Sequence, residues 1–135
     1  MFTGVHHTAL ITRDLESTTR FWRDALGLPL TTQIDRDGLR HWFFQLTEHD
    51  AIAFFEFAQE IPDGIASKRP GVTPTDGRHF DHLALGVDSR DGLDALGARL
   101  AEHGVEVRGP VDHGVCHSIY FEDPNGISLE ACCPQ

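Results

Sequence analysis

The chain has 135 residues, enough for one compact domain or for two small halves that share a core. Its 21 acidic residues outnumber its 11 basic residues, and the resulting net charge of −10 would repel a phosphate backbone. The sequence has no basic stripe and no apolar run long enough to cross a bilayer, so we expect neither nucleic acid nor a membrane as a partner.

The first half is predicted to form a strand, a helix and three further strands. The apolar stretch "VHHTALIT", residues 5–12, has the composition of a buried strand. Apolar residues then recur at helical spacing, with Asp14 placed to cap the helix and Gly27 placed to end it. Three short strand-like segments follow, at residues 30–34, 40–46 and 51–57. The turn-forming sequence of residues 35–38 separates the first two of them.

Residues 58–78 interrupt this pattern. They contain Pro62, Pro70 and Pro74 and show no periodicity. A linker of about 20 residues is longer than most connections in compact domains. We interpret it either as a crossover between the two halves or as an arm that reaches a partner.

The second half repeats the order of the first. "FDHLALGV", residues 80–87, predicts a strand, and the helix that follows has Asp88 or Ser89 as its cap and Gly104 as its end. Three further strands are predicted at residues 105–107, 116–121 and 127–132, the last two joined by a turn at 123–126. We therefore predict an α+β fold, a single domain over 1–135 with βαβββ modules at 1–57 and 79–135.

The two halves also share a histidine. When residues 5–12 are aligned with 80–87, His7 falls on His82 and Ala9 on Ala84. Because side chains alternate along a strand, His82 is expected to share its face with small residues, which leave a concavity open. If the halves pair about a pseudo-twofold axis, both histidines face one cavity.

Two glutamates lie in apolar strands of the same modules. Glu130 is expected to share its face with Ser128 and Cys132, and Glu56 lies in the most aromatic strand. A buried carboxylate has to be paired or bound to a metal. His7, Glu56, His82 and Glu130 are thus a candidate site for a divalent cation with nitrogen and oxygen ligands. The structural alternative is that the histidines are core residues and the glutamates face solvent.

The cysteines and the N-terminus predict a reducing compartment. Cys116, Cys132 and Cys133 are odd in number and form no CxxC motif, which argues against a disulfide framework and a zinc knuckle. The N-terminus has no basic region followed by an apolar stretch, the pattern of a secretory signal. We expect a cytoplasmic protein.

Three segments together, "VHHTALITRDLESTTRFWRDALGLPL", "FDHLALGV" and "SIYFEDPNGISLE", resemble the vicinal oxygen chelate superfamily over essentially the whole chain. This group contains glyoxalase I, methylmalonyl-CoA epimerase, extradiol dioxygenases, fosfomycin-modifying enzymes and bleomycin-resistance proteins. The resemblance implies an open, cup-shaped mixed sheet with helices outside and a divalent metal on the concave face. By position, it implies His7, His82 and Glu130 as metal ligands. It also implies a small-molecule substrate and a homodimer.

The C-terminal part is similar to the extradiol dioxygenase pattern, which is matched by His113, Ile119-Tyr120, Asp123-Pro124, Gly126 and Glu130. This similarity implies a ring-cleaving dioxygenase that uses Fe²⁺ and acts on a small aromatic diol. In such enzymes the residues matched by His113 and Tyr120 contact the substrate and are catalytic. The second active-site histidine of those enzymes has no clear counterpart in this sequence unless His41 or His79 supplies it. An aromatic wall, Trp42, Phe43, Phe44, Phe54 and Phe55, would offer a surface for the ring, although half of it must point into the core.

Two alternatives stay open. In the glyoxalase I pattern Glu56 is a fourth ligand of Ni²⁺ or Zn²⁺, and Glu56 or Glu130 moves a proton while an enediolate forms. No arginine pattern for a glutathione pocket accompanies it. The other alternative is a metal-free protein of the bleomycin-resistance kind, which binds a cationic drug between two subunits.

Overall fold

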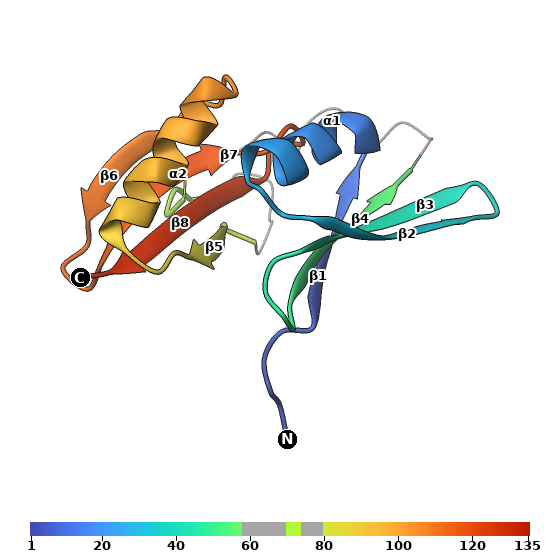
Figure 1. Cartoon of the computed structure of the whole chain (residues 1–135), viewed down its shortest axis with the longest axis horizontal. Coiled ribbons are helices and arrows are strands. Elements are labelled where there is room, and N and C mark those ends of the chain that lie inside the picture. The colour runs from blue at the N-terminus through green and yellow to red at the C-terminus, as the bar shows by residue number, and fades with distance from the viewer. Residues whose placement is uncertain (58–69, 74–79) are drawn as a thin grey trace. The chain divides into compact units, whose positions relative to one another are not determined.

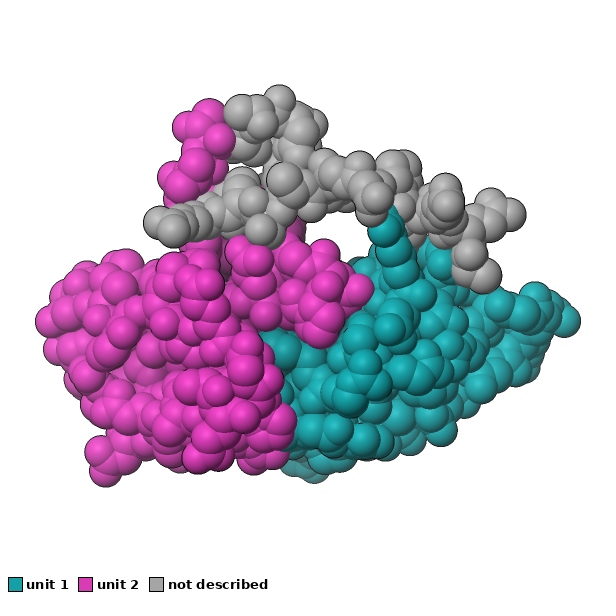
Figure 2. Space-filling model, turned by 90° about the horizontal axis from the view of Figure 1, so that it is seen from above, with its two compact units in different colours: residues 1–63 teal, residues 64–135 magenta. Residues whose placement is uncertain are grey.

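A computed structural model of the chain describes residues 1–57, 70–73 and 80–135 (Figure 1). The chain divides into two compact units, residues 1–63 and 64–135 (Figure 2). Each unit contains a strand, a helical segment and three further strands, so the predicted α+β fold with two βαβββ modules is confirmed. The predicted linker lies outside the described residues except for 70–73, and the single-domain organisation stays a prediction. No helix within the described ranges is long and apolar enough to span a membrane.

Unit 1 is a four-stranded mixed sheet with one helical segment. Its elements are β1 (His7–Thr12), α1 (Leu15–Thr19), η1 (Arg20–Ala25), β2 (Leu30–Arg36), β3 (Leu39–Gln45) and β4 (Ala51–Glu56). The strand order is β1-β4-β3-β2, with β1 parallel to β4 and the other pairs antiparallel. Asp37 and Gly38 form the tight turn between β2 and β3, both with positive φ (54° and 79°), which is the geometry that favours Asp-Gly there.

The helix of unit 1 begins as predicted and continues in a form that was not predicted. Asp14 caps it by accepting hydrogen bonds from the backbone N–H groups of Glu16 and Ser17 at 3.0 and 3.1 Å. From Arg20 the turn widens to a π-helix, in which the N–H of Leu26 donates to the carbonyl of Phe21. The segment buries Trp22 completely, and its ring lies 5.6 Å from that of Phe54 on the sheet.

Removing the charge of the Asp14 cap is expected to destabilise the chain only above acidic pH. The backbone N–H of Ser17, and secondarily Glu16, lower the pKa of Asp14 below 3.8. When the pKa of a carboxyl is lower in the folded state, its contribution to stability is present above the unfolded-state pKa. This contribution is lost as pH falls through the folded-state pKa. Thermal melts of wild type and Asp14→Ala should therefore differ most above pH 5 or so, and the difference should shrink as pH falls through the folded-state pKa. A difference that is constant with pH would contradict this.

Unit 2 is also a four-stranded mixed sheet with one helix. Its elements are β5 (Leu83–Gly86), α2 (Arg90–Glu102), β6 (Arg108–Asp112), β7 (Cys116–Glu122) and β8 (Ser128–Pro134), with strand order β5-β8-β7-β6. Ser89, one of the two predicted caps, accepts a hydrogen bond from the N–H of Gly92 at 3.1 Å. Helix α2 packs along β7 and β8 and covers one face of the sheet (Figure 1). The opposite face is left open by this unit.

Two boundaries of unit 2 differ from the prediction. The strand predicted at 105–107 is wrong: these residues precede β6, and the N–H of Val105 donates to the carbonyl of Leu100 at the end of α2. Pairing with β7 begins only at Arg108, opposite Tyr120. The strand predicted at 80–87 begins at Leu83, so His82 lies just before β5 and not within it. This second difference determines what His82 contacts.

Candidate metal centre and active site

The register of unit 2 brings its polar site residues onto one face. Glu130 on β8 lies opposite Ala84 on β5 and opposite Tyr120 on β7. Directly opposed residues point to the same side of a sheet, and residues one position away point to the other side. Leu129 and Ala131, on either side of Glu130, are fully buried on the face that α2 covers. Glu130 and Tyr120 therefore lie on the open face, as the strand alternation predicts.

His82 lies between two carboxylates. Its Nε2 is 2.8 Å from Oε2 of Glu130, and its Nδ1 is 2.7 Å from Oδ2 of Asp81. A neutral imidazole has a single N–H, which it can donate to one of these carboxylates but not to both. If Asp81 accepts that hydrogen, the unprotonated Nε2 faces Glu130 and the pair is complete only with a proton or a metal cation.

The Glu130 side chain is mostly buried and is hydrogen-bonded. It is 11% exposed, and Oε1 accepts a hydrogen bond from the Ser118 hydroxyl at 2.5 Å. A buried carboxylate of this kind requires a positive partner. One imidazole nitrogen and one carboxylate oxygen suit a divalent metal, and a carboxylate on the far nitrogen is the usual support of a metal-binding histidine. The residues thus fit a metal ion.

The two residues are not a full ligand set. Among the described residues, no group of three or more His, Cys, Asp and Glu side chains is arranged to hold a metal. Unit 2 therefore offers two candidate ligands, His82 and Glu130, and a bound metal would require at least one more.

Tyr120 and His113 form a hydrogen-bonded pair beside this site. The Tyr120 hydroxyl is 2.7 Å from Nε2 of His113, and the Tyr120 ring lies edge-on to His82 with centroids 6.5 Å apart. Burial, and then the negative charge of Glu130, raise the pKa of Tyr120. The phenol therefore keeps its proton at neutral pH, and it can donate that proton to His113 or to a ligand oxygen.

His7, the predicted ligand of the first half, lies on the open face of unit 1. It is exposed on β1, with Nδ1 2.9 Å from Nδ1 of His6 and its ring 5.7 Å from that of Phe43. His41 shares this face and stacks on Phe55 with ring centroids 3.5 Å apart. Burial, and then the charge of His7, lower the pKa of His41, which favours its neutral form.

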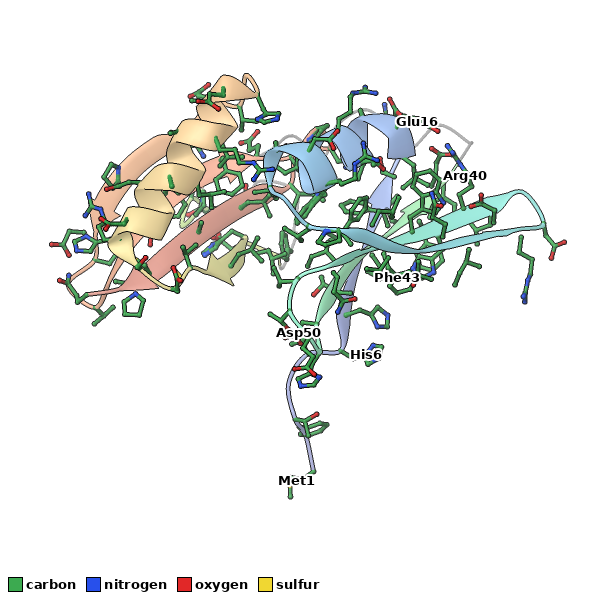
Figure 3. All side chains as sticks on the ribbon, in the orientation of Figure 1. Met1, His6, Glu16, Arg40, Phe43 and Asp50 are labelled. Atoms are coloured by element: carbon green, nitrogen blue, oxygen red, sulfur yellow. The ribbon has the colours of Figure 1, made fainter. Side chains whose placement is uncertain are left out.

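The open face of unit 1 also has a concavity. A cavity of about 320 Å³ lies over Phe43, lined also by His6, Thr32, Ile34, Gln45 and Ala51 among others. Figure 3 labels His6 and Phe43 at this site. Of the five residues of the predicted aromatic wall, the register places Phe43 and Phe55 on this face, while Trp42, Phe44 and Phe54 lie on the face that the helical segment covers.

Glu56 is not brought together with His7. It pairs with Thr12 at the far end of β1, and one-residue alternation along β4 places it on the covered face, opposite to the face of His7. Its carboxylate accepts hydrogen bonds from the Arg40 guanidinium at 2.6 to 2.8 Å and from the N–H of Leu15 at 2.8 Å. Arg40 reaches Glu16 as well (Figure 3). The position and contacts of Glu56 are those of a helix-to-sheet connection.

A model of the Glyoxalase/Bleomycin resistance protein/Dioxygenase superfamily matches residues 4–131. The chain belongs to this superfamily. The resemblance to vicinal oxygen chelate proteins is thereby confirmed, and the superfamily contains enzymes as well as resistance proteins.

Individual members of the superfamily differ in activity. The chain is 28% identical over 128 residues to a catechol-2,3-dioxygenase of Bacillus subtilis (strain 168), a match over 95% of this chain and 40% of that protein. It is 25% identical over 131 residues to a probable lactoylglutathione lyase of Vibrio parahaemolyticus, covering 92% of this chain and 86% of the relative. A crystal structure of a glyoxylase/bleomycin resistance protein/dioxygenase domain from Frankia sp. EAN1pec superposes with a TM-score of 0.80 at 25% identity, over 100% of this chain and 94% of that one.

Sequence reasoning missed three residues that contact the predicted site residues His82, Glu130 and Glu56. Asp81 adjoins His82, but neighbours in an uninterrupted strand point to opposite faces, so strand alternation gives no signal for their contact. The contact exists because β5 starts only at Leu83, three residues later than predicted, so Asp81 and His82 both precede the strand. Ser118 and Arg40 bind Glu130 and Glu56 from adjacent strands, and only the register identifies them. His79 lies outside the described residues.

Proposed function

We propose that the chain is a metal-dependent dioxygenase that cleaves the ring of a small aromatic diol. His82 and Glu130 would hold the divalent metal, Fe²⁺ in this proposal, and the family resemblance implies His7 as a further ligand. When bound, the ion would supply the Lewis-acid and redox chemistry by which a diol reacts with O₂.

The observation that carries the proposal is the Tyr120–His113 hydrogen bond beside the His82–Glu130 pair. It supplies an acid–base couple next to the candidate metal ligands. The glyoxalase I alternative depends on Glu56 as a ligand, and that carboxylate is bound by Arg40 and lies on the face opposite to His7. The match to a catechol-2,3-dioxygenase along 95% of this chain supports the same choice.

Each polar residue has a role in this proposal. Tyr120 donates a hydrogen bond to a substrate oxygen, and His113 exchanges the proton through the Tyr120 hydroxyl. Asp81 fixes the orientation of His82, while Ser118 fixes that of Glu130.

Oxygen uptake tests the proposed function. Protein loaded anaerobically with Fe²⁺ is mixed with O₂ and a panel of catechols and hydroquinones, and consumption of O₂ is measured together with loss of the ring. We expect uptake with at least one diol. Isomerisation of a 2-oxoaldehyde–thiol adduct by the Ni²⁺- or Zn²⁺-loaded protein, with no O₂ uptake, would establish the glyoxalase alternative instead.

Replacing Tyr120 with phenylalanine is expected to lower kcat for O₂ uptake by about 100-fold or more, since a positioned proton-transfer group contributes that much. KM and metal content should change little, because the ring and the ligands remain. His113→Gln should lower kcat similarly, and the double variant should be no worse than the single variants, because the two residues act as one unit. His103→Gln is a matched control, because Nδ1 of His103 contacts the Arg99 carbonyl at the end of α2 and His103 belongs to neither set of candidate site residues. Equal rates in wild type and Tyr120→Phe would contradict the assigned role.

A further inference from the structure

One cation on the open face of unit 2 has an unused donor. Arg108 on β6 lies directly opposite Tyr120 and therefore on the same side of the sheet as Tyr120 and Glu130. Its Nη2 is buried and has no hydrogen-bond partner within the described part of the chain. Arg108 as a whole is only half-buried.

An unsatisfied guanidinium nitrogen is unexpected in so acidic a chain. The guanidinium is always charged, and burying a charged donor without an acceptor is unfavourable. The chain has 21 acidic residues, and Arg23, Arg40 and Arg90 each contact a carboxylate at 3.1 Å or less. The unused donor of Arg108 therefore suits an anion that comes from outside the chain.

The register fixes how far this cation lies from the candidate metal ligand. Ala84, Glu130, Tyr120 and Arg108 form one row across β5, β8, β7 and β6. Adjacent strands lie about 4.8 Å apart, so the backbones of Glu130 and Arg108 are separated by about 10 Å. A single substituted ring, together with the long arginine side chain, can bridge this distance.

We propose that Arg108 binds a carboxylate on the substrate, and that the substrates are dihydroxy aromatic acids and not unsubstituted diols. A planar guanidinium matches a carboxylate through two parallel hydrogen bonds, which gives both affinity and orientation. With the carboxylate on Arg108, the hydroxyl groups at the other end of the ring face Tyr120 and Glu130. The diol part of this inference rests on the proposed function; the anion site does not.

Ligand binding without turnover tests the anion site. Titration calorimetry under anaerobic conditions compares benzoate, 3,4-dihydroxybenzoate and catechol on the intact chain. Arg108→Met is expected to raise the Kd of both carboxylates by about 10-fold or more, the range of a hydrogen bond to a charged group. The Kd of catechol should change by less than about twofold. Arg108→Lys should restore carboxylate binding only in part, because lysine keeps the charge but cannot make the two parallel hydrogen bonds of the guanidinium. Arg36→Met, which removes an exposed arginine on β2, should change nothing.

The outcomes separate the anion site from the proposed reaction. If benzoate binding depends on Arg108 and no diol is cleaved, the anion site stands and the dioxygenase proposal fails. The anion site would be overturned if Arg108→Met weakened the binding of catechol and of the carboxylates equally. It would also be overturned if Arg108→Met left carboxylate binding unchanged, or if the wild type bound no carboxylate. Far-UV circular dichroism of each variant shows that it is folded before it is titrated.

Discussion

Replacing His82 with alanine is expected to abolish binding of a divalent metal. Wild type loaded with Fe²⁺ should retain about one ion per chain after desalting, and the variant should retain almost none, since even supporting residues of a metal site change affinity by about 10- to 100-fold. The physical reason is that Nε2 of His82 and Oε2 of Glu130 are already 2.8 Å apart, while the Ser118 hydroxyl holds Oε1 of Glu130. Metal content measured by elemental mass spectrometry checks this without any assay of activity.

Matched variants make the result specific. Glu130→Gln should lose the metal as well, because it removes the charge but keeps the size of the side chain. Asp81→Asn should weaken binding by about 10- to 100-fold without abolishing it, as expected of a residue that orients a ligand. His103→Ala should retain the full content. Should His82→Ala keep as much metal as wild type, the candidate centre would have to be assigned to other residues.

The sequence predicted the elements of this site better than its contacts. Alternation along a strand places Glu130 and Tyr120 on the open face, and the register agrees because β7 and β8 are regular there. The π-helical turn after Arg20 and the late start of β6 have no such signal, because both depend on packing and pairing partners that are remote in sequence. Periodicity predicts which face a residue occupies, but pairing decides which residue it meets.

Glu56 shows the same limit more sharply. A histidine at the start of β1 and a glutamate at the end of β4 belong to neighbouring strands, and the sequence alone does not state which residues are opposite each other. A shift of one residue in the pairing register moves every side chain of a strand to the opposite face. The observed pairing of His7 with Ala51 and of Thr12 with Glu56 places the glutamate on the covered face. There it meets Arg40, its directly opposed neighbour on β3.

Replacing Glu56 with glutamine is consequently expected to destabilise unit 1 while leaving the metal in place. Removing one partner of a fully buried ion pair costs roughly 3–5 kcal/mol, whereas an exposed pair contributes about 0–1 kcal/mol. The Glu56 and Arg40 side chains are 16% and 30% exposed, so we expect an intermediate loss of about 2 kcal/mol in the free energy of unfolding. Urea denaturation measures it.

The neighbouring carboxylate provides the control for this prediction. Glu16 also bonds to Arg40 but is 58% exposed, and Glu16→Gln should therefore cost about 0–1 kcal/mol. Metal content must be measured on the same samples, because the two roles of Glu56 predict opposite results. A glutamine variant that is as stable as wild type but loses its metal would identify Glu56 as a ligand and return the glyoxalase I chemistry to first place. A less stable variant with full metal content would show that Glu56 joins helix α1 to the sheet and is not a metal ligand.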